Sequence, residues 1–320
     1  MLTIFIFFVN KNNSMKKKSI AVLAAVAFVF IILLAVLLLM SGTNNPATYS
    51  DVKYGPDSRN TLDIYLPDSA ENMTADVPAF LYIHGGGWST GSKEDGKGYA
   101  EGLNSNGYAV ISINYRYLSD DVDCYDILDD IDLVMKFIDE NGADYHIRTD
   151  KIAVGGDSAG GHLAMLYAYS RESPVPVAFV MSGVGPADLS DPGFFENPYA
   201  AKGSDVFFWS VFNQLAGTNY TLEEMKSGNT PELLKVSPIY YIGEGSAPTV
   251  FGYGVKDELV PFSNAERMKA KVESLDGYEY EFWVFENSGH ALNENGVDSE
   301  VAERYYLGVF EGLEKYLLDY

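Results

Sequence analysis

The chain has 320 residues and is strongly acidic, with 45 aspartates and glutamates against 22 lysines and arginines and a formal net charge of −23. A polyanion would be repelled, so nucleic acid is excluded as an expected partner. Apolar residues make up 47% of the chain, enough for a large packed core, which excludes a disordered acidic tail. The single cysteine, Cys124, rules out an intrachain disulfide framework and a cysteine-cluster zinc site.

The N-terminal part predicts a membrane segment. Residues 20–40 are apolar throughout and carry no charge, and as a helix they are long enough to cross a bilayer core of about 30 Å. Lys16, Lys17 and Lys18 precede them, so the positive-inside rule predicts residues 1–19 in the cytoplasm and the rest outside the cell membrane. The favoured interpretation is an uncleaved single-pass anchor, because no small-residue cleavage site follows. A cleaved signal peptide and a secreted protein are the alternative.

After this segment we expect a linker over residues 41–50 and a catalytic domain over residues 51–320. Short apolar, β-rich stretches alternate with helical patterns, which predicts a mostly parallel central sheet with helices on both faces. Ligands of such sheets bind beyond the carboxyl ends of the strands. The strand candidates are residues 79–83, 109–113, 152–154, 178–181, 249–253 and 280–285.

One helix is predicted between the second and third strand candidates. Ile127, Ile131, Val134 and Ile138 recur at helical spacing and share one face. The acidic residues between positions 120 and 132 lack the spacing of an EF-hand loop, so we interpret them as a solvated face rather than a calcium site.

The third strand candidate leads into GDSAG at residues 156–160, a match to G-x-S-x-G that is followed by a helical pattern. A sharp turn from strand to helix presents the serine hydroxyl at the edge of the sheet, so Ser158 is the predicted nucleophile. The alternative is a glycine-rich phosphate-binding turn, but the lysine of a P-loop and the G-x-G-x-x-G pattern are both missing.

The first strand candidate ends in HGGGW at residues 84–88. Three glycines after a strand can bring backbone N–H groups close to a reacting oxygen, as an oxyanion hole requires. The alternative is a merely flexible glycine loop. We expect His84 to order this loop through hydrogen bonds.

The general base can be chosen by elimination among four histidines. His146 precedes a strand and so lies at the opposite edge of the sheet, and His162 is inside the helix after Ser158, where we expect it to pack between elements. His290 follows the last strand in a loop at the carboxyl edge, and it is the predicted base.

The acid that orients this histidine is expected at the same edge. Asp257 follows the strand candidate at 249–253, and the chain order Ser158, Asp257, His290 is the one that this architecture requires. Glu258 and Glu286 are either surface charges or rival acids.

Together these residues resemble the α/β-hydrolase superfamily, and within it the esterases with an HGG-type oxyanion loop, of the hormone-sensitive-lipase-like or feruloyl/acetyl-xylan-esterase-like branch. INYRY at 113–117, GGDSAGGH at 155–162 and G-x-x-D-x-x-V-P at 254–261 extend the resemblance. It implies that the backbone N–H groups of Gly86, Gly87 and Ala159 form the oxyanion hole, and that neither a metal nor a cofactor is needed.

Nearly 70 residues separate the strand candidates at 178–181 and 249–253, which predicts a cap insertion at about 186–240. We expect its aromatic residues both to cover the substrate pocket and to form a small core of their own. These residues are Phe194, Phe195, Tyr199, Phe207, Phe208, Trp209, Phe212 and Tyr220.

The sequence therefore predicts a serine carboxylesterase that hydrolyses short-chain acyl esters through an acyl-enzyme, with a small-molecule or carbohydrate ester as substrate and carbohydrate or phenolic alcohols as candidate leaving groups. An exo-acting serine peptidase or amidase on the same fold is the enzymatic alternative. A catalytically silent adhesion protein is the other, and it would predict a missing triad residue. The sequence does not indicate an oligomeric state.

Overall fold

The computed structural model describes residues 48–67 and 76–318. The predicted cytoplasmic segment 1–19, the membrane segment 20–40 and most of the linker 41–50 lie outside this part. No helix within the described residues is long and apolar enough to cross a membrane. The first strand begins at Tyr49, so the last two residues of the predicted linker already belong to the sheet.

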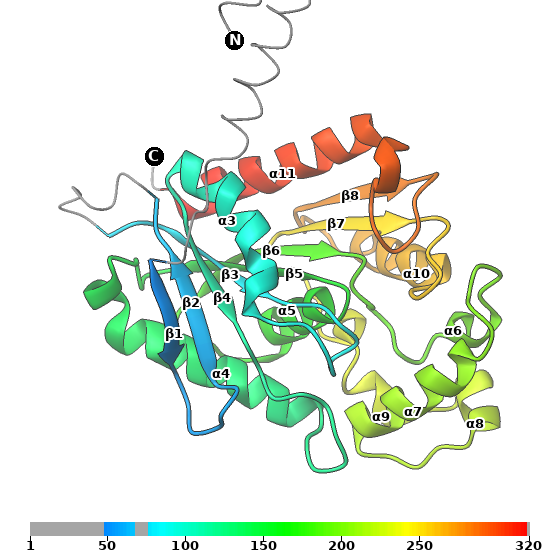
Figure 1. The fold of residues 1–320 in the computed structure, drawn as a ribbon. Helices are drawn as coiled ribbons and strands as arrows, with labels where there is room; N and C mark the ends of the chain where they lie inside the picture. The colour runs from blue at the N-terminus through cyan, green and yellow to red at the C-terminus, as the bar shows by residue number, and fades with distance from the viewer. Residues whose placement is uncertain (1–47, 68–75, 319–320) are drawn as a thin grey trace, which may run out of the picture. The chain divides into compact units, whose positions relative to one another are not determined.

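A single eight-stranded sheet forms the centre of the domain, in the order β1-β2-β4-β3-β5-β6-β7-β8 (Figure 1). The strands from β4 to β8 in this order are parallel to their neighbours, whereas β1 and β2 are antiparallel. All six predicted strands are confirmed. The strands are β1 (Tyr49–Lys53), β2 (Thr61–Tyr65), β3 (Ala79–Ile83), β4 (Ala109–Ile113), β5 (Ile152–Asp157), β6 (Val177–Gly183), β7 (Thr249–Gly254) and β8 (Tyr280–Phe285).

The two antiparallel strands, β1 and β2, were not predicted. β1 is a polar edge strand, and β2 carries Asp63 in its middle, which interrupts the apolar pattern of a buried strand. Asp63 is nevertheless buried, because the Lys93 ammonium lies 2.8 Å from its carboxylate. A charged residue is tolerated inside the domain only with such a partner, and the sequence pattern does not reveal the partner.

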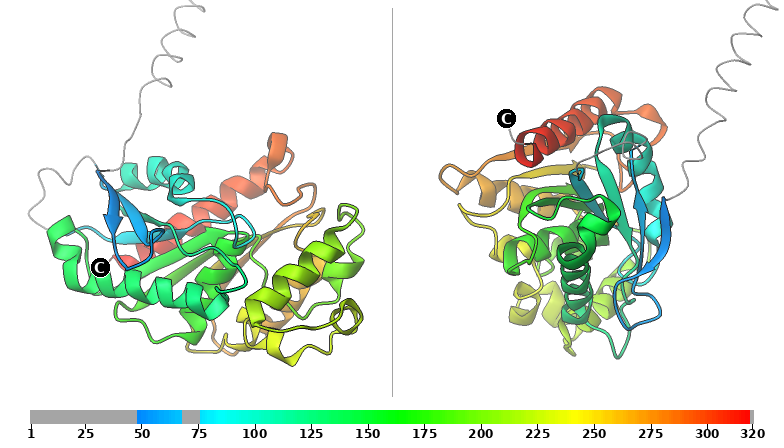
Figure 2. Two further views of the ribbon diagram at one scale, coloured as in Figure 1. Left: turned by 60° about the horizontal axis from the view of Figure 1, so that its bottom comes forward. Right: turned by 90° about the vertical axis from the view of Figure 1, so that its left-hand side faces the viewer.

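Helices α4, α5 and α10 cover one face of the sheet, and α3 and α11 cover the other (Figures 1 and 2). Side chains alternate along each strand, so β3 supplies both cores: Leu81 and Ile83 pack with α4 and α5, and Phe80 packs with α3 and α11. The helices are α3 (Lys97–Leu103), α4 (Cys124–Asn141), α5 (Ala159–Ser170), α6 (Gly193–Glu196), α7 (Ser204–Ala216), α8 (Leu222–Lys226), α9 (Pro231–Leu234), α10 (Phe262–Glu273) and α11 (Ser299–Leu317).

The predicted helix is α4, and its four isoleucine and valine positions are all buried. The expectation of a solvated acidic face is wrong at Asp130, which is 1% exposed. Its carboxylate accepts the backbone N–H of Arg116 at 2.8 Å and Arg116 Nε at 3.0 Å. Arg116, from the INYRY motif, thus ties the end of β4 to α4. No group of acidic, histidine or cysteine residues in the described part of the chain is arranged to hold a metal ion.

The insertion between β6 and β7 contains helices α6 to α9 and lies beyond the carboxyl ends of the strands (Figure 1). Phe194, Phe208 and Phe212 are buried and pack with ring centroids 4.9–5.5 Å apart. Phe207 and Trp209 on α7 are 45% and 37% exposed. These rings belong to the same apolar cluster as Leu81 and Ile83, so the expected separate core is wrong: the aromatic core of the insertion is continuous with that of the sheet, and other rings lie at the surface.

Candidate active site

Ser158 occupies the turn between β5 and α5 with backbone angles φ 55° and ψ −124°, a combination that residues other than glycine rarely adopt. Holding a residue there costs about 1–3 kcal/mol, which the surrounding structure must supply. The backbone N–H of Ser158 donates to Gly183 O on β6 at 2.7 Å. The turn is therefore anchored to the neighbouring strand while the hydroxyl points out of it.

The two glycines of the GDSAG motif are required by the end of β3. A Cβ atom on Gly156 or on Gly160 would collide with the carbonyl oxygen of Ile83. β3 can pass so close to the turn only because both positions lack a side chain. This contact explains the small residues on both sides of Ser158.

Three residues from separate loops meet at this turn. His290 Nε2 lies 2.8 Å from Ser158 Oγ, and His290 Nδ1 lies 2.9 and 3.0 Å from the two carboxylate oxygens of Asp257. A carboxylate only accepts hydrogen bonds, so the ring proton belongs on Nδ1, and Nε2 is left to accept the hydroxyl proton of Ser158. The structure thus brings together the three residues that the sequence nominated.

The two rival acids do not contact the imidazole in this way. Glu258 Oε2 accepts the backbone N–H of His290 at 3.2 Å, and Glu286 is exposed. Asp257 is 1% exposed, and its Oδ1 also accepts the backbone N–H groups of Leu259 and Val260 at 2.8 and 2.9 Å. These bonds hold the Asp257 carboxylate in one orientation toward the ring.

A further acid, Asp298, holds the loop that carries His290. Its carboxylate accepts Ser288 Oγ at 2.6 Å and the backbone N–H of Asn287 at 2.9 Å. Burial opposes ionisation of Asp298, but these hydrogen bonds outweigh it and keep the pKa of the carboxyl below its usual range. Sequence analysis missed this residue, although its place just before the last helix is a common one for a capping aspartate.

The HGGGW loop passes directly beside Ser158. A Cβ atom on Gly85 would lie 3.4 Å from Ser158 Cβ, and Gly86 and Gly87 adopt φ angles of 99° and 58°. Among the described residues, no hydrogen bond uses the backbone N–H of Gly86, Gly87 or Ala159. These three N–H groups are thus free to bind an oxygen atom next to Ser158.

His84 orients the peptide group between Gly85 and Gly86. Its Nδ1 lies 2.7 Å from Gly85 O, and the ring stacks on Tyr115 at 4.2 Å. Burial lowers the pKa of His84 to about 4, against the opposing effect of this hydrogen bond, so the ring is neutral and Nδ1 donates. Because C=O and N–H point in opposite directions across a trans peptide, the Gly86 N–H is directed away from His84.

Arg59, in the turn between β1 and β2, supports this loop from behind, and no sequence motif indicated it. Its Nε donates to Tyr115 O at 2.7 Å, and its Nη2 lies 3.2 Å from Asn114 Oδ1 and 3.5 Å from His84 Nε2. The guanidinium also stacks over the ring of Tyr117 at 3.6 Å. Residues of the INYRY motif thus contact both Arg59 and His84 and hold them in place behind the loop.

The remaining two histidines lie where the sequence analysis expected them. His162 is buried in α5, where its Nε2 lies 2.7 Å from Val236 O and its Nδ1 accepts Trp88 Nε1–H at 3.2 Å. It therefore joins α5 to the oxyanion loop and to the end of the cap. His146 is exposed before β5, at the opposite edge of the sheet.

The cap reaches the oxyanion loop through Phe207 on α7. A Cβ atom on Gly87 would lie 3.4 Å from the Cζ atom of this ring. An exposed aromatic ring therefore lies beside Gly87 and limits the space next to this residue.

The sheet order, the strained serine turn, and the histidine and glycine loops define this chain as an α/β-hydrolase with an HGG-type oxyanion loop. This confirms the resemblance found in the sequence. The chain belongs to the BD-FAE family, whose model matches residues 62–272.

Two curated relatives and one solved structure show the range of similar proteins. Esterase LipQ of Mycobacterium tuberculosis is 27% identical over 261 residues, which cover 77% of this chain and 58% of LipQ. Kynurenine formamidase of Danio rerio is 25% identical over 249 residues, 72% of this chain and 81% of that protein. A truncated carbohydrate esterase from gut microbiota shares the fold with a TM-score of 0.64 at 20% identity, over 83% of this chain and 98% of that one.

The chain spans about half the length of the mycobacterial esterases it matches.

Proposed function

We propose that this protein is a serine carboxylesterase in which Ser158, His290 and Asp257 form the catalytic triad. The observation that carries the proposal is the continuous chain of contacts from Asp257 through His290 to Ser158 Oγ, beside N–H groups that have no acceptor among the described residues. The esterase relatives and the BD-FAE membership support it.

The reaction follows from these contacts. Ser158 Oγ attacks the ester carbonyl carbon as its proton passes to His290 Nε2, and the carbonyl oxygen becomes an oxyanion bound by the N–H groups of Gly86, Gly87 and Ala159. The C–O bond to the alcohol then breaks, and the alcohol leaves with the proton from His290. Water repeats the sequence on the acyl-enzyme and releases the acid and free Ser158.

The substrate proposal is a short-chain acyl ester with a carbohydrate or phenolic alcohol. Phe207 next to Gly87 supports a small acyl space, because the ring stands against the oxyanion loop. An amidase remains the enzymatic alternative, and the kynurenine formamidase relative is the observation that favours it. Hydrolysis rates on an acetyl ester and on the matching acetanilide or formanilide separate the two activities.

The proposed nucleophile is tested with Ser158→Ala. The hydroxyl makes few packing contacts, so the variant should fold normally and lose ester hydrolysis by about 10⁴-fold or more. Near-wild-type turnover in a well-folded Ser158→Ala protein would move the nucleophile elsewhere. A wild-type protein without activity on any ester would favour the adhesion alternative.

We further propose that residues 20–40 anchor the catalytic domain to the outer side of the cell membrane. The proposal rests on the uncharged apolar segment and the lysines before it. Protease added to intact cells should digest the domain, and the N-terminal fragment should stay with the membrane. Release of a soluble protein with a new N-terminus near residue 41 would instead identify a cleaved signal peptide.

A further inference from the structure

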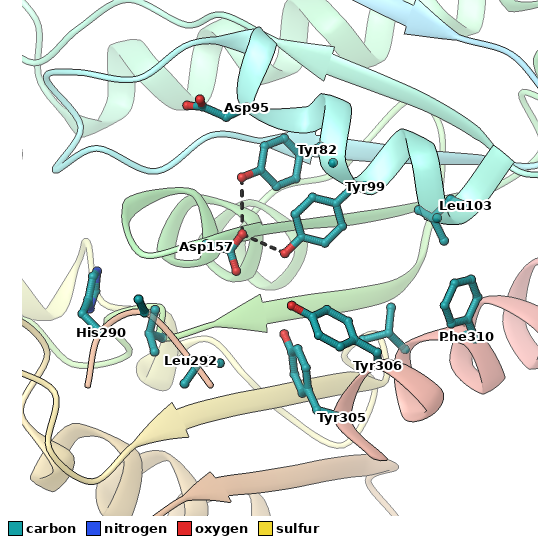
Figure 3. Close-up of a pocket in the computed structure, with 15 residues that line it drawn as sticks. Tyr82, Asp95, Tyr99, Leu103, Asp157, His290, Leu292, Tyr305, Tyr306 and Phe310 are labelled. Atoms are coloured by element: carbon teal, nitrogen blue, oxygen red, sulfur yellow. Dashed lines mark hydrogen bonds between the residues drawn. The ribbon is translucent and has the colours of Figure 1, made fainter. Parts of the chain in front are cut away.

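A groove of about 660 Å³ lies between α3 and α11, on the face of the sheet opposite to α4 and α5 (Figure 3). One end of it is formed by His290 and the two residues that follow it. Five of its fifteen lining residues are tyrosine or phenylalanine, namely Tyr82, Tyr99, Tyr305, Tyr306 and Phe310, and Asp157 lies among them. Its size falls within the range of small-molecule binding sites, about 300–1,000 Å³.

Two exposed glycines of α3 line this groove. Gly98 and Gly102 are four residues apart on α3 and both line the groove, and a Cβ atom on either would meet no other atom within 4 Å. Each glycine inside a helix costs about 1 kcal/mol relative to alanine. No steric contact requires glycine at either position, so a larger side chain can be added there without a clash.

The groove carries polar groups that suit hydroxyl-bearing ligands. At its floor, Asp157 Oδ2 accepts Tyr99 Oη at 2.7 Å and Tyr82 Oη at 3.3 Å (Figure 3). Tyr305 is 1% exposed, and its hydroxyl has no hydrogen-bond partner in the described part of the chain. In Figure 3 this hydroxyl points toward the Asp157 side of the groove. An unpaired buried hydroxyl is unfavourable, so a hydrogen-bonding group supplied from the groove would stabilise it.

The charge and shape of the lining restrict the ligand further. Two carboxylates, Asp95 and Asp157, line the groove, and its described lining contains no lysine or arginine, so an anionic ligand is disfavoured. The rim is formed by Tyr306, which is 48% exposed and offers a flat apolar surface. Aromatic faces combined with hydrogen-bond acceptors recognise rings that have apolar faces and hydroxyl edges.

We propose that this groove binds the alcohol portion of the ester, an uncharged polyhydroxylated ring such as a glycosyl residue, and so selects the leaving group. The inference rests on the proposed function, because His290 is the residue that returns a proton to the leaving alcohol. The groove starts at His290, and neither Ser158 nor any residue of the oxyanion loop at 84–92 lines it. In this proposal the acyl carbonyl lies at the oxyanion loop, and the alcohol extends past His290 into the groove.

Filling the groove tests this directly. Gly102→Leu adds a side chain in open space and improves the helix propensity of α3, so the fold should be kept. Glu101→Leu is the matched control, because it adds the same side chain to the same helix at an exposed position that does not line the groove. Thermal unfolding of both variants checks their integrity.

The kinetic readout is the ratio of kcat/KM for acetylated xylotetraose to kcat/KM for ethyl acetate, whose alcohol is too short to reach into the groove. We expect Gly102→Leu to lower this ratio at least about tenfold, and Glu101→Leu to leave it unchanged. An unchanged ratio in Gly102→Leu, or an equal fall in Glu101→Leu, overturns the proposal. Should Gly102→Leu misfold, Tyr306→Ala removes the aromatic ring at the rim instead, and the same ratio should fall.

A binding measurement separates this proposal from the proposed function. Calorimetry with unesterified xylotetraose and the Ser158→Ala protein needs no catalysis. We expect binding that is lost when Gly102→Leu is added. Equal binding with and without that change overturns the groove proposal even if the protein is an esterase. If wild type hydrolyses neither ester, the esterase proposal fails while the binding result still decides what the groove holds.

Discussion

Replacing Asp257 by asparagine separates an acid that orients His290 from one that merely lies near it. In the structure, Asp257 Oδ1 accepts two backbone N–H groups, from Leu259 and Val260, at 2.8 and 2.9 Å. An asparagine has only one accepting oxygen in its side chain. These two donors therefore hold the amide oxygen at the Oδ1 position and turn the NH₂ group to the Oδ2 position, which lies 2.9 Å from His290 Nδ1.

An NH₂ donor at that position favours the tautomer in which His290 Nδ1 accepts, in competition with the amide oxygen, which lies 3.0 Å from the same nitrogen. The ring proton then moves to Nε2, which faces Ser158 Oγ at 2.8 Å and can no longer take the hydroxyl proton. The imidazolium formed during the reaction also loses its counter-charge. A loss of about 10⁴-fold in kcat is expected, which corresponds to about 5.4 kcal/mol of transition-state stabilisation.

The assay compares kcat on 4-nitrophenyl butyrate for Asp257→Asn, Glu258→Gln and Glu286→Gln, with thermal unfolding to confirm the fold. Glu258→Gln keeps an acceptor for the backbone N–H of His290, and Glu286 is exposed, so both controls should stay close to wild type. A loss below about tenfold for Asp257→Asn, or a loss of similar size for either control, would refute the reasoning about the tautomer.

Three other predictions follow from the site. Arg59→Met leaves the Tyr115 carbonyl without its donor, at a cost of about 1–3 kcal/mol. It should lower kcat about ten- to a hundredfold with little change in KM. A lower melting temperature with unchanged kcat would show that Arg59 has a purely structural role. Burial lowers the pKa of His84 and of His162 to about 4. In the unfolded chain both histidines have pKa values near 6.5, so they become protonated at a pH where they stay neutral in the folded domain. The free energy of unfolding should therefore fall between about pH 6.5 and 4, by up to about 3 kcal/mol per histidine. Urea unfolding that gives equal stability at pH 7.5 and 4.5 would contradict this. Finally, kcat/KM should peak at acetyl to butyryl esters and fall at least about tenfold at twelve carbons; a steady rise with chain length would indicate a lipase.

The residues that sequence analysis placed well belong to short, locally determined patterns. GDSAG can be recognised in the sequence because a serine in a strained turn needs small neighbours within two positions. In the structure, the Ile83 carbonyl oxygen is the atom that leaves no room for a side chain at those neighbours. His290 and Asp257 could be nominated because parallel strands bring all their carboxyl ends to one edge, whatever the distance along the chain. The catalytic roles of these residues stay predictions until the variants are measured.

Other features depend on partners that are distant in the sequence. Arg59 acts on His84, 25 positions away, through a turn between two strands that have no clear strand pattern. Asp63 and Asp130 look like solvated acids, yet Lys93 and Arg116 make their burial possible. A sequence pattern predicts that a charged side chain is exposed unless its partner is known, and only the folded chain identifies the partner.

The groove between α3 and α11 likewise combines features that the sequence predicts with features that only the tertiary structure determines. By itself the sequence determined that helices lie on both faces of the sheet, because strand and helix periods are local properties. It did not distinguish Gly98 and Gly102 from ordinary helix residues, since an absent side chain has meaning only when the space beside it is known. Which rings of the cap are buried, and which face the oxyanion loop, was likewise decided by packing, because it depends on how α7 is rotated against its neighbours.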